Sequence, residues 1–453
     1  MTTAHCHDVI IIGGGLSGLR AADLLQHTRD IVLLEARDRV GGRALAHSFA
    51  NGDTADLGGQ WVGPGQDRLY ALIEQFGMTT YPLWDQGDRL VLNGEKLGRY
   101  TGTIPKLAPH VLINVHLMMT RFDAMAAQLD PAKPWAHPKA TQWDHQTVGQ
   151  WMEKQAFTRQ AFNIFAVGIG AVFTAEPHEI SLLHALFYAR AGTSLDNLLA
   201  TTGGAQQDRV HGNMAGLAQR LAEGLGDRVK LNHPVETIAW SDAGVTVTTA
   251  QGAFKARRAI LALPPTQAVR LRYDPVLPSR RAALWQRMPP GACIKCIAQY
   301  ETPFWREDGL AGQAVGPDLE VRVTFDNSEA GKDAGLLLGF IEGDHARQWS
   351  GRDPAERRAA VLQAFARYFG PRALDPIDYV DQDWIAEDYT RGCYAALMGP
   401  GVWTSLGMDL RQPIGPMHVA GTETATQYYG YFEGALQAAE RAVAEIETAL
   451  GAD

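Results

Sequence analysis

The chain of 453 residues has only four cysteines, which are too few and too scattered for a disulfide framework: Cys6, Cys293, Cys296 and Cys393. This usage argues against a small secreted scaffold and predicts a reducing cytoplasm. Cys293 and Cys296 have metal-ligand spacing, but residues 292–298 are typical of a strand. Because an offset of three on a strand places side chains on opposite faces, the two thiols should not share a metal.

The sequence also has no long apolar run and no excess of basic residues. The uncharged apolar stretch of residues 161–175 is shorter than the roughly 20 residues of a membrane-spanning helix. Lys and Arg number 41 against 50 Asp and Glu, and the net charge of −9 offers no long-range attraction to nucleic acid or anionic lipid. We therefore expect neither a nucleic acid nor a membrane as a partner.

The N-terminus has neither a secretion signal nor a convincing metal site. The first apolar run begins at Val9 without a basic segment before it, so the sequence predicts no signal peptide. His5, Cys6 and His7 could touch a metal, but we interpret them as part of a frayed terminal tail. No metal site is predicted anywhere in the chain.

A glycine-rich turn between two apolar runs is the most informative segment. Residues 9–12 are apolar, Gly13, Gly15 and Gly18 follow, and residues 31–34 form the second run. The order of strand, turn, helix and strand predicts a dinucleotide-binding unit. Gly13 permits a sharp turn, Gly15 lets the backbone approach a pyrophosphate, and Gly18 lets the helix pack closely on the sheet. The phosphates should then lie at a helix N-terminus.

Glu35 ends the second apolar run, where a carboxylate accepts a hydrogen bond from a ribose 2′-hydroxyl and would repel a 2′-phosphate. An unphosphorylated adenosine ribose is therefore expected. This pattern alone does not choose between NAD and FAD.

Length and changes in sequence pattern predict two domains built from a discontinuous chain, since 453 residues exceed what one hydrophobic core usually holds. The fold class is α/β plus α+β: a Rossmann-like nucleotide-binding domain and a substrate domain with a mixed sheet and helices. Helices are expected near residues 107–129, 181–188, 353–368 and 431–450. The nucleotide domain should comprise residues 1–80, 210–285 and 391–453, and the substrate domain residues 81–209 and 286–390.

Residues 35–43, which follow the glycine turn, contain an arginine and a glycine pair that resemble the FAD-pyrophosphate segment of the flavoprotein amine oxidases. Further motifs continue the likeness in family order through residues 56–64, 174–176, 204–206, 294–296, 303–306, 392–394, 420–426 and 430–434. The whole set resembles monoamine oxidase more than any other branch. This resemblance decides for FAD.

The resemblance implies that FAD extends through the first domain and that its flavin faces a cavity in the second. It also implies a covalent bond between Cys393 and the flavin 8α-methyl group, against the simpler alternative of a buried cysteine. The residues that it implies for FAD binding are Gly13, Gly15, Ser17, Gly18, Glu35, Ala36, Arg37, Gly42, Arg43, Gly58, Gly59, Gln60, Trp61, Val235, Cys393, Gly421, Thr422 and Tyr431.

Three residues carry the implied catalytic roles. Lys295 would face the flavin and assist its reaction with O2, although a lysine on a strand is ordinarily a snorkelling edge residue. Tyr394 and Tyr431 would form an aromatic cage that guides a neutral amine, although aromatic clusters are often simply core. The substrate pocket would include Val172, Phe173, Leu198, Leu199, Gln206 and Val323.

The family reaction moves a hydride equivalent from the carbon next to nitrogen to the flavin, and O2 then yields H2O2. Residues 166–174 and 198–206 contain no Asp or Glu, so the distal ammonium of a diamine or polyamine would be desolvated and unpaired. We expect oxidative deamination of aliphatic, alicyclic or arylalkyl primary monoamines to an imine, which hydrolyses to an aldehyde or ketone and ammonia.

Three alternatives stay open. An L-amino acid oxidase would need an arginine for the substrate carboxylate, and Arg99 or Arg190 could serve. A diamine or polyamine oxidase belongs to the same superfamily, and a flavin scaffold without turnover is the least expected. The chain ends at Asp453, directly after its terminal helix, where mitochondrial members carry a membrane anchor, so we expect a soluble enzyme. We also expect it to be cytoplasmic and a homodimer.

Overall fold

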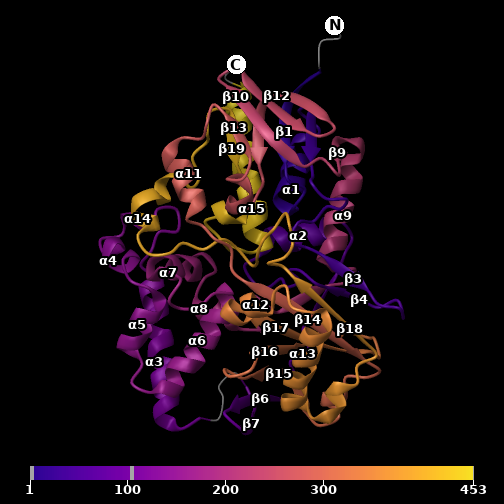
Figure 1. The fold of residues 1–453 in the computed structure, drawn as a ribbon, viewed down its shortest axis with the longest axis vertical. Coiled ribbons are helices and arrows are strands. Elements are labelled where there is room, and N and C mark those ends of the chain that lie inside the picture. Colours follow the sequence, from indigo (N-terminus) through magenta and orange to yellow (C-terminus); the bar gives the residue numbers. More distant parts are fainter. Residues whose placement is uncertain (1–4, 103–106, 452–453) are drawn as a thin grey trace.

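An eight-stranded sheet covered by helices forms the upper part of the molecule in Figure 1. The computed structural model describes residues 5–102 and 107–451. The strands are β1 (Cys6–Ile12), β2 (Ile31–Leu34), β9 (Val229–Lys230), β10 (Val235–Ser241), β11 (Gly244–Thr249), β12 (Gly252–Leu261), β13 (Arg272–Asp274) and β19 (Met417–Val419). They lie in the order β13-β10-β11-β12-β1-β2-β9, and β19 pairs with β12.

The glycine turn follows the C-terminal end of the strand β1, as predicted. The strand β1 pairs in parallel with β2 and β12, and α1 (Leu16–Leu25) begins directly after the turn. Gly13 has a φ of +105°, and a Cβ atom there would lie 2.6 Å from the Ala262 carbonyl oxygen. A Cβ atom at Gly18 would lie 1.9 Å from the Gly13 carbonyl oxygen, so only glycine lets α1 approach this closely. The predicted strand, turn, helix and strand are confirmed.

Three further helices pack together with α1 beside the first sheet. The helix α1 packs against α15 (Phe432–Gly451) and α9 (Asn213–Leu225), and α2 (Asp67–Gln75) packs against α15. Leu19, Leu217 and Ile446 are fully buried between these helices and the sheet. This apolar core holds the glycine turn rigidly, because burial of such side chains contributes about 2 kcal/mol each.

A seven-stranded mixed sheet forms the lower right of the molecule in Figure 1. Its strand β14 (Cys293–Tyr300) is buried along its whole length between β17 (Gly335–Glu342) and the edge strand β18 (Asp378–Asp383). The helices α12 (Gly343–Trp349) and α13 (Pro354–Phe369) pack on this part. The other strands are β6 (Asp88–Asn93), β7 (Lys96–Tyr100), β15 (Leu310–Val315) and β16 (Val323–Asp326), and the order is β18-β14-β17-β16-β15-β6-β7.

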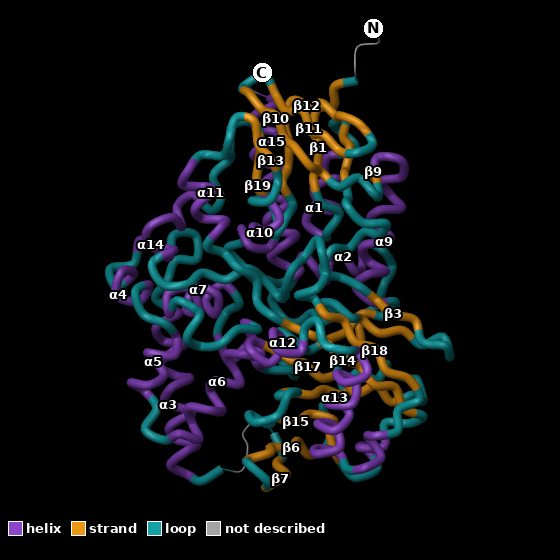
Figure 2. Tube along the Cα trace, viewed as in Figure 1, coloured by secondary structure: helices purple, strands orange, loops and turns teal. Residues whose placement is uncertain are grey.

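A group of helices lies beside this second sheet, in purple at the lower left of Figure 2. The predicted helix at 107–129 is confirmed as α3 (Pro109–Ala126), which begins at a proline because proline fits the first helical turn. The others are α4 (Ala140–Asp144), α5 (Val148–Gln155), α6 (Arg159–Phe173), α7 (Leu182–Ala191) and α8 (Leu195–Leu199). Among the described residues, none of the helices combines the length and apolar character that crossing a membrane requires.

Short elements connect the two parts. The strands β5 (Thr80–Pro82) and β8 (Asp208–Val210) pair where the chain passes between the predicted domains. The first sheet draws its strands from residues 1–80, 210–285 and 391–453, and the second sheet from residues 81–209 and 286–390, so the predicted fold class is confirmed. The exact domain limits stay a prediction. Residues 1–4, 103–106 and 452–453 lie outside the described residues. The remaining elements are β3 (Ala46–Ser48), β4 (Thr54–Asp56), α10 (Pro265–Ala268), α11 (Ser279–Gln286) and α14 (Val402–Leu406).

The interpretation of His5, Cys6 and His7 as a frayed tail is wrong. Cys6 and His7 belong to β1 and pair with β12, because backbone hydrogen bonds extend the strand to its first residues. His5 Nε2 and His7 Nδ1 lie 2.7 and 3.1 Å from the same oxygen of Asp30. These two hydrogen bonds account for the clustering of the His5, His7 and Asp30 side chains. The opposite orientation of Cys293 and Cys296 is confirmed, since they belong to different hydrophobic clusters.

Candidate active site

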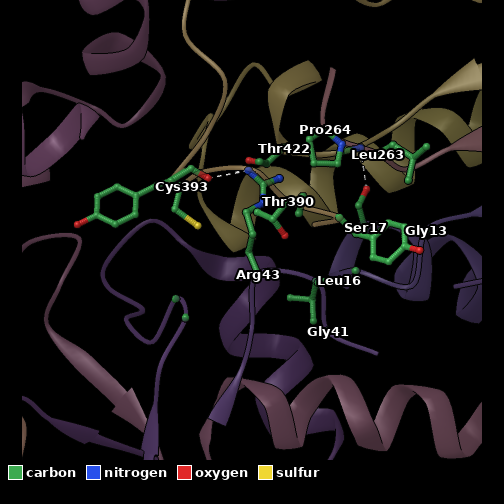
Figure 3. A pocket seen from close by; sticks show the side chains of 18 of the residues that line it. Gly13, Leu16, Ser17, Gly41, Arg43, Leu263, Pro264, Thr390, Cys393 and Thr422 are labelled. Carbon is green, nitrogen blue, oxygen red and sulfur yellow. Dashed lines mark hydrogen bonds between the residues drawn. The ribbon is translucent and has the colours of Figure 1, made fainter. Parts of the chain in front are cut away.

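A cavity of about 550 Å³ runs from the glycine turn toward the second sheet. Figure 3 shows Gly13, Leu16 and Ser17 at one part of it and Arg43 and Cys393 at another. The sequence-predicted residues that line it are Gly13, Gly15, Ser17, Glu35, Ala36, Arg37, Gly42, Arg43, Gly58, Gly59, Gln60, Trp61, Val172, Gln206, Val235, Lys295, Cys393, Tyr394, Gly421, Thr422 and Tyr431.

Five predicted site residues do not line the cavity. Gly18 lies in α1, where its role is the close helix packing described above. Phe173 and Leu198 are buried in the core, Leu199 packs beside it, and Val323 belongs to the cluster that contains Phe340 and Tyr394. These four apolar side chains are not part of the lining, because on a helix or strand only some positions face the cavity.

Two arginines that line the cavity, Arg37 and Arg43, each form an ion pair with a glutamate. Arg43 Nη1 donates to the Tyr394 carbonyl oxygen at 2.6 Å and to Glu423 Oε1 at 2.7 Å. Burial opposes its charge, but Glu423 outweighs burial and raises the pKa of Arg43. Arg37 Nε donates to Glu387 Oε1 at 2.7 Å. Both guanidinium groups therefore stay charged beside the path expected for a pyrophosphate.

The backbone at this end forms an open cradle. The Gly14 N–H donates to Glu35 Oε2 at 2.6 Å, which fixes the carboxylate at the end of β2. A Cβ atom at Gly15 would meet nothing closer than Gly42 Cα at 3.9 Å, so space remains above the helix N-terminus. Ser17 Oγ accepts a hydrogen bond from the Gly421 N–H at 2.9 Å (Figure 3). A dinucleotide phosphate fits this cradle.

The other end of the cavity offers a donor that the protein leaves without an acceptor. Trp61 lines the cavity, and its indole Nε1 is buried with no hydrogen-bond partner in the structure. An unpaired buried donor costs about 1–3 kcal/mol unless a bound group accepts from it. A flavin ring, which carries several acceptor atoms, would satisfy this donor, so the residues present fit FAD at both ends.

Lys295 lies on β14, between β17 and β18 of the second sheet, and is only 2% exposed. Its Nζ donates to the Gly58 carbonyl oxygen at 2.8 Å and to Gln60 Oε1 at 2.6 Å, which leaves one N–H of the ammonium for a further acceptor. Burial lowers the pKa of Lys295, while the nearby carboxylate of Asp56 opposes this shift. The alternative of an edge lysine does not hold, because both neighbouring strands of β14 are present.

Cys393 is a buried free thiol that lines the cavity. Burial raises its pKa to about 12, although the positive charge of Arg43 acts in the opposite direction. The thiol is therefore protonated and inert toward solvent in this form. Its place in the wall is compatible with the predicted flavin bond and with an ordinary buried cysteine.

Tyr394 and Tyr431 both line the cavity and are partly buried. Burial raises the pKa of both phenols, so both rings are neutral at physiological pH. Phe340 lies edge-on to Tyr394 with ring centroids 6.1 Å apart, and Tyr188 lies 6.3 Å from Tyr431. Neither Phe340 nor Tyr188 was predicted, because each reaches the cavity through strand register or helix packing and carries no local motif.

The two arginines considered for a substrate carboxylate lie outside the lining. Arg99 donates to Asp88 and to the Asp308 carbonyl oxygen at 3.2 and 2.8 Å on the protein surface. Arg190 Nε donates to the Leu129 carbonyl oxygen at 3.4 Å. Neither guanidinium is among the described residues that line the cavity.

The sequence matches the model of the family described as flavin containing amine oxidoreductase over residues 16–447. The chain belongs to this family. It is accordingly an oxidoreductase that uses FAD, which agrees with the cradle, the arginines and the unpaired indole donor of the cavity.

Proteins that are named for different amine substrates are similar to this chain to a comparable degree. AofH of Mycobacterium tuberculosis, a flavin-containing monoamine oxidase by name, is 40% identical over 444 residues, which are 98% of this chain and 97% of AofH. Putrescine oxidase bound to putrescine has a TM-score of 0.94 and 35% identity, covering 98% of this chain and 100% of that one. Cyclohexylamine oxidase from Brevibacterium oxydans IH-35A has a TM-score of 0.95 and 31% identity, covering 99% and 100%.

Proposed function

We propose that this chain oxidises primary monoamines with apolar bodies and passes the electrons to O2. The observation that carries this proposal is the lining of the cavity around Gln206, whose buried Oε1 is an acceptor without a partner. An amine N–H is a donor that would satisfy it. Tyr394, Tyr431 and Phe340 supply aromatic walls in the same cavity.

The acidic residues of the lining support a monoamine rather than a diamine. Glu35 accepts hydrogen bonds from the Gly14 N–H of the glycine turn and from the Arg37 N–H, and Glu236 lies on β10 of the first sheet. Asp388 follows Glu387, the partner of Arg37. All three belong to the nucleotide end, so none of the lining carboxylates described is placed to pair with a second ammonium.

The chain's own residues would orient the amine and exclude water. Bound FAD supplies the redox chemistry by accepting a hydride equivalent from the carbon next to nitrogen. Ring faces carry negative quadrupole density, so Tyr394 and Tyr431 can guide a neutral amine nitrogen without binding its proton. Turnover should therefore rise with pH toward the pKa of the substrate ammonium.

A substrate panel tests the proposal through H2O2 release. Purified protein is mixed with benzylamine, hexylamine or cyclohexylamine, with putrescine as the diamine, and with L-leucine as the amino acid. We expect the best monoamine to exceed putrescine and L-leucine in kcat/KM by about tenfold or more, because a second charge in the apolar cavity is unpaired.

The same panel separates the alternatives. Preference for putrescine would replace the proposal with a diamine oxidase, and preference for L-leucine with an L-amino acid oxidase. Release from none of these substrates by protein that retains its flavin would contradict turnover of simple amines altogether.

The covalent bond between FAD and Cys393 is part of this proposal. The thiol lines the cavity, and putrescine oxidase has been solved as an alanine-to-cysteine mutant in a redesign of its cofactor binding, which is consistent with a cysteine acting on the cofactor in this fold. After acid precipitation, we expect the yellow colour to stay in the wild-type pellet and to be released from Cys393→Ala. The matched control is Cys293→Ala, which removes another buried thiol of the cavity and should keep the colour bound. Colour in the wild-type supernatant would show that FAD is bound without a covalent bond.

A cytoplasmic homodimer stays a prediction from the sequence. Light scattering of the purified protein would give its mass directly, and a mass near that of one 49.4 kDa chain would contradict the dimer.

A further inference from the structure

A buried carboxyl group, that of Glu342, lies beside the cavity and next to the hydroxyl group of Tyr394. Glu342 is the last residue of β17 and is 1% exposed. The Tyr394 hydroxyl donates to Glu342 Oε1 at 3.3 Å, while Glu342 Oε2 is buried without a partner. Glu342 does not line the cavity itself, so any influence on an amine must pass through the tyrosine.

The cation nearest to Glu342 is already engaged. Arg322 Nη1 donates to Glu176 Oε1 at 3.4 Å, and Glu176 Oε1 also accepts the Asp344 N–H at 3.2 Å. Gly170 on α6 leaves room between the two groups, since a Cβ atom there would lie 3.8 Å from Arg322 Nη1 and 3.9 Å from Glu342 Oε2. Glu342 is therefore a buried acid that forms no ion pair within the part of the chain that the structure describes, although the charge of Arg322 acts on it from a distance.

The other titratable groups around Glu342 do not neutralise it. Burial lowers the pKa of His345 on α12, and Arg322 lowers it further, so this imidazole is neutral near pH 7. Burial and the charge of Glu342 raise the pKa of Cys293 on β14, which stays a thiol. Burial raises the pKa of Glu342 to about 7, although Arg322 and the hydrogen bond from Tyr394 favour its charged form.

We propose that Glu342 is a positioning residue for Tyr394, which it holds in the cage in its ionised form and releases when it becomes protonated. This inference rests on the proposed function. The reason is that a carboxylate accepts a phenol hydrogen bond about twice as strongly as a neutral carboxyl group does. A ring anchored at its hydroxyl keeps its face toward the cavity, whereas a loosened ring can turn away.

The proposal predicts an ionisation in amine oxidation that belongs to the protein and not to the substrate. Anaerobic stopped-flow measures flavin reduction by the best monoamine from pH 5.5 to 9. We expect Glu342→Gln, which keeps the size of the side chain, to reduce the rate at pH 8 about fivefold, the cost of one charge-assisted hydrogen bond becoming neutral. The substitution should also abolish the step near pH 7 in the rate of flavin reduction, so that wild type and Glu342→Gln have equal rates at low pH.

Glu176→Gln is the matched control, because it neutralises the neighbouring acid that does not touch Tyr394. Removing its charge frees Arg322 and removes a like charge, and both effects favour ionised Glu342. The step should remain and move to lower pH. Lys295 and Asp56 titrate in all three proteins, so differences between them report on Glu342.

A double-mutant cycle tests whether Glu342 acts through the hydroxyl. In Tyr394→Phe the hydroxyl is absent, so adding Glu342→Gln should change the reduction rate at pH 8 by less than twofold. An additional fivefold loss would show that Glu342 acts on the substrate by another route and would overturn the positioning role.

Thermal unfolding provides a readout that does not depend on turnover. Because its pKa is raised in the folded state, protonated Glu342 contributes stability below its unfolded pKa, and this stability is lost as pH rises through about 7. The melting temperature of wild type relative to Glu342→Gln should therefore fall between pH 5 and pH 8. A constant difference would contradict the buried, titrating carboxyl group.

The outcomes distinguish this inference from the proposed function. If monoamines are oxidised but Glu342→Gln retains the step near pH 7, the positioning role is wrong and the function stands. If the melting temperatures of wild type and Glu342→Gln differ with pH as expected but no monoamine reduces the flavin, the proposed function is wrong. The positioning role of Glu342 in amine oxidation is then wrong as well.

Discussion

Replacement of Lys295 by methionine should slow the reaction of reduced flavin with O2 about hundredfold, the typical cost of removing a preorganised charged group from a buried site. The ammonium is held by the Gly58 carbonyl oxygen and Gln60 Oε1, and it lies about equally far from the rings of Trp61 and Phe340, at 6.0 and 5.9 Å. Methionine fills a similar volume without charge. Rapid mixing of the reduced variant with oxygenated buffer measures the rate.

The charge of Lys295 should also make the rate of flavin reoxidation by O2 depend on pH. Because burial lowers the pKa of Lys295, its ammonium is lost at lower pH than that of an exposed lysine. The wild-type reoxidation rate should fall as pH rises through the neutral range, and that of Lys295→Met should not. Lys332→Met is the control, since Lys332 is 52% exposed and pairs with Asp53 at 3.7 Å. Equal reoxidation rates in wild type and Lys295→Met would remove Lys295 from the oxygen reaction.

Truncation of either cage tyrosine should reduce kcat/KM for the best monoamine by about tenfold or more, since the variant loses an aromatic face that orients the amine. Tyr394→Ala and Tyr431→Ala should both retain FAD, because the cradle of the glycine turn is untouched and Arg43 bonds to the backbone carbonyl oxygen of residue 394, which alanine keeps. Steady-state H2O2 release gives kcat/KM, and the flavin absorbance gives the FAD content.

Two variants test whether the ring faces are responsible. Tyr431→Phe keeps the ring and should stay within about twofold of wild type, because the proposed role needs no hydroxyl at this position. Tyr429→Phe removes a hydroxyl that donates to the Ala396 carbonyl oxygen in the core, and it should leave kcat/KM unchanged. Wild-type kcat/KM in both alanine variants would exclude the cage and, with it, the monoamine oxidase interpretation of this pocket.

Local sequence determines the nucleotide end of this protein. The turn at Gly13 needs a positive φ, Gly18 needs the absence of a Cβ atom, and Glu35 needs only its place at the end of a short strand. Such requirements act over a few neighbouring residues, so they can be seen in the sequence. The same holds for β14, whose apolar residues on both sides of Lys295 predict a buried strand.

The substrate end was decided by contacts between distant segments. The family resemblance predicted Phe173, Leu198 and Val323 for the substrate pocket, but the packing of whole elements left them out of the cavity lining. Phe340 faces the cavity because β17 pairs with β14 in a register that sets it opposite Lys295.

What the sequence by itself determined is therefore the cofactor, the family of the reaction and the residues that carry local motifs. Only the tertiary structure brought Glu342 to the hydroxyl of Tyr394 and removed Arg99 and Arg190 from the site. The physical reason is that a charge acquires its role from its surroundings. Burial raises the pKa of Glu342 against the opposing charge of Arg322, and its surroundings come from segments as distant along the chain as Gly170 on α6.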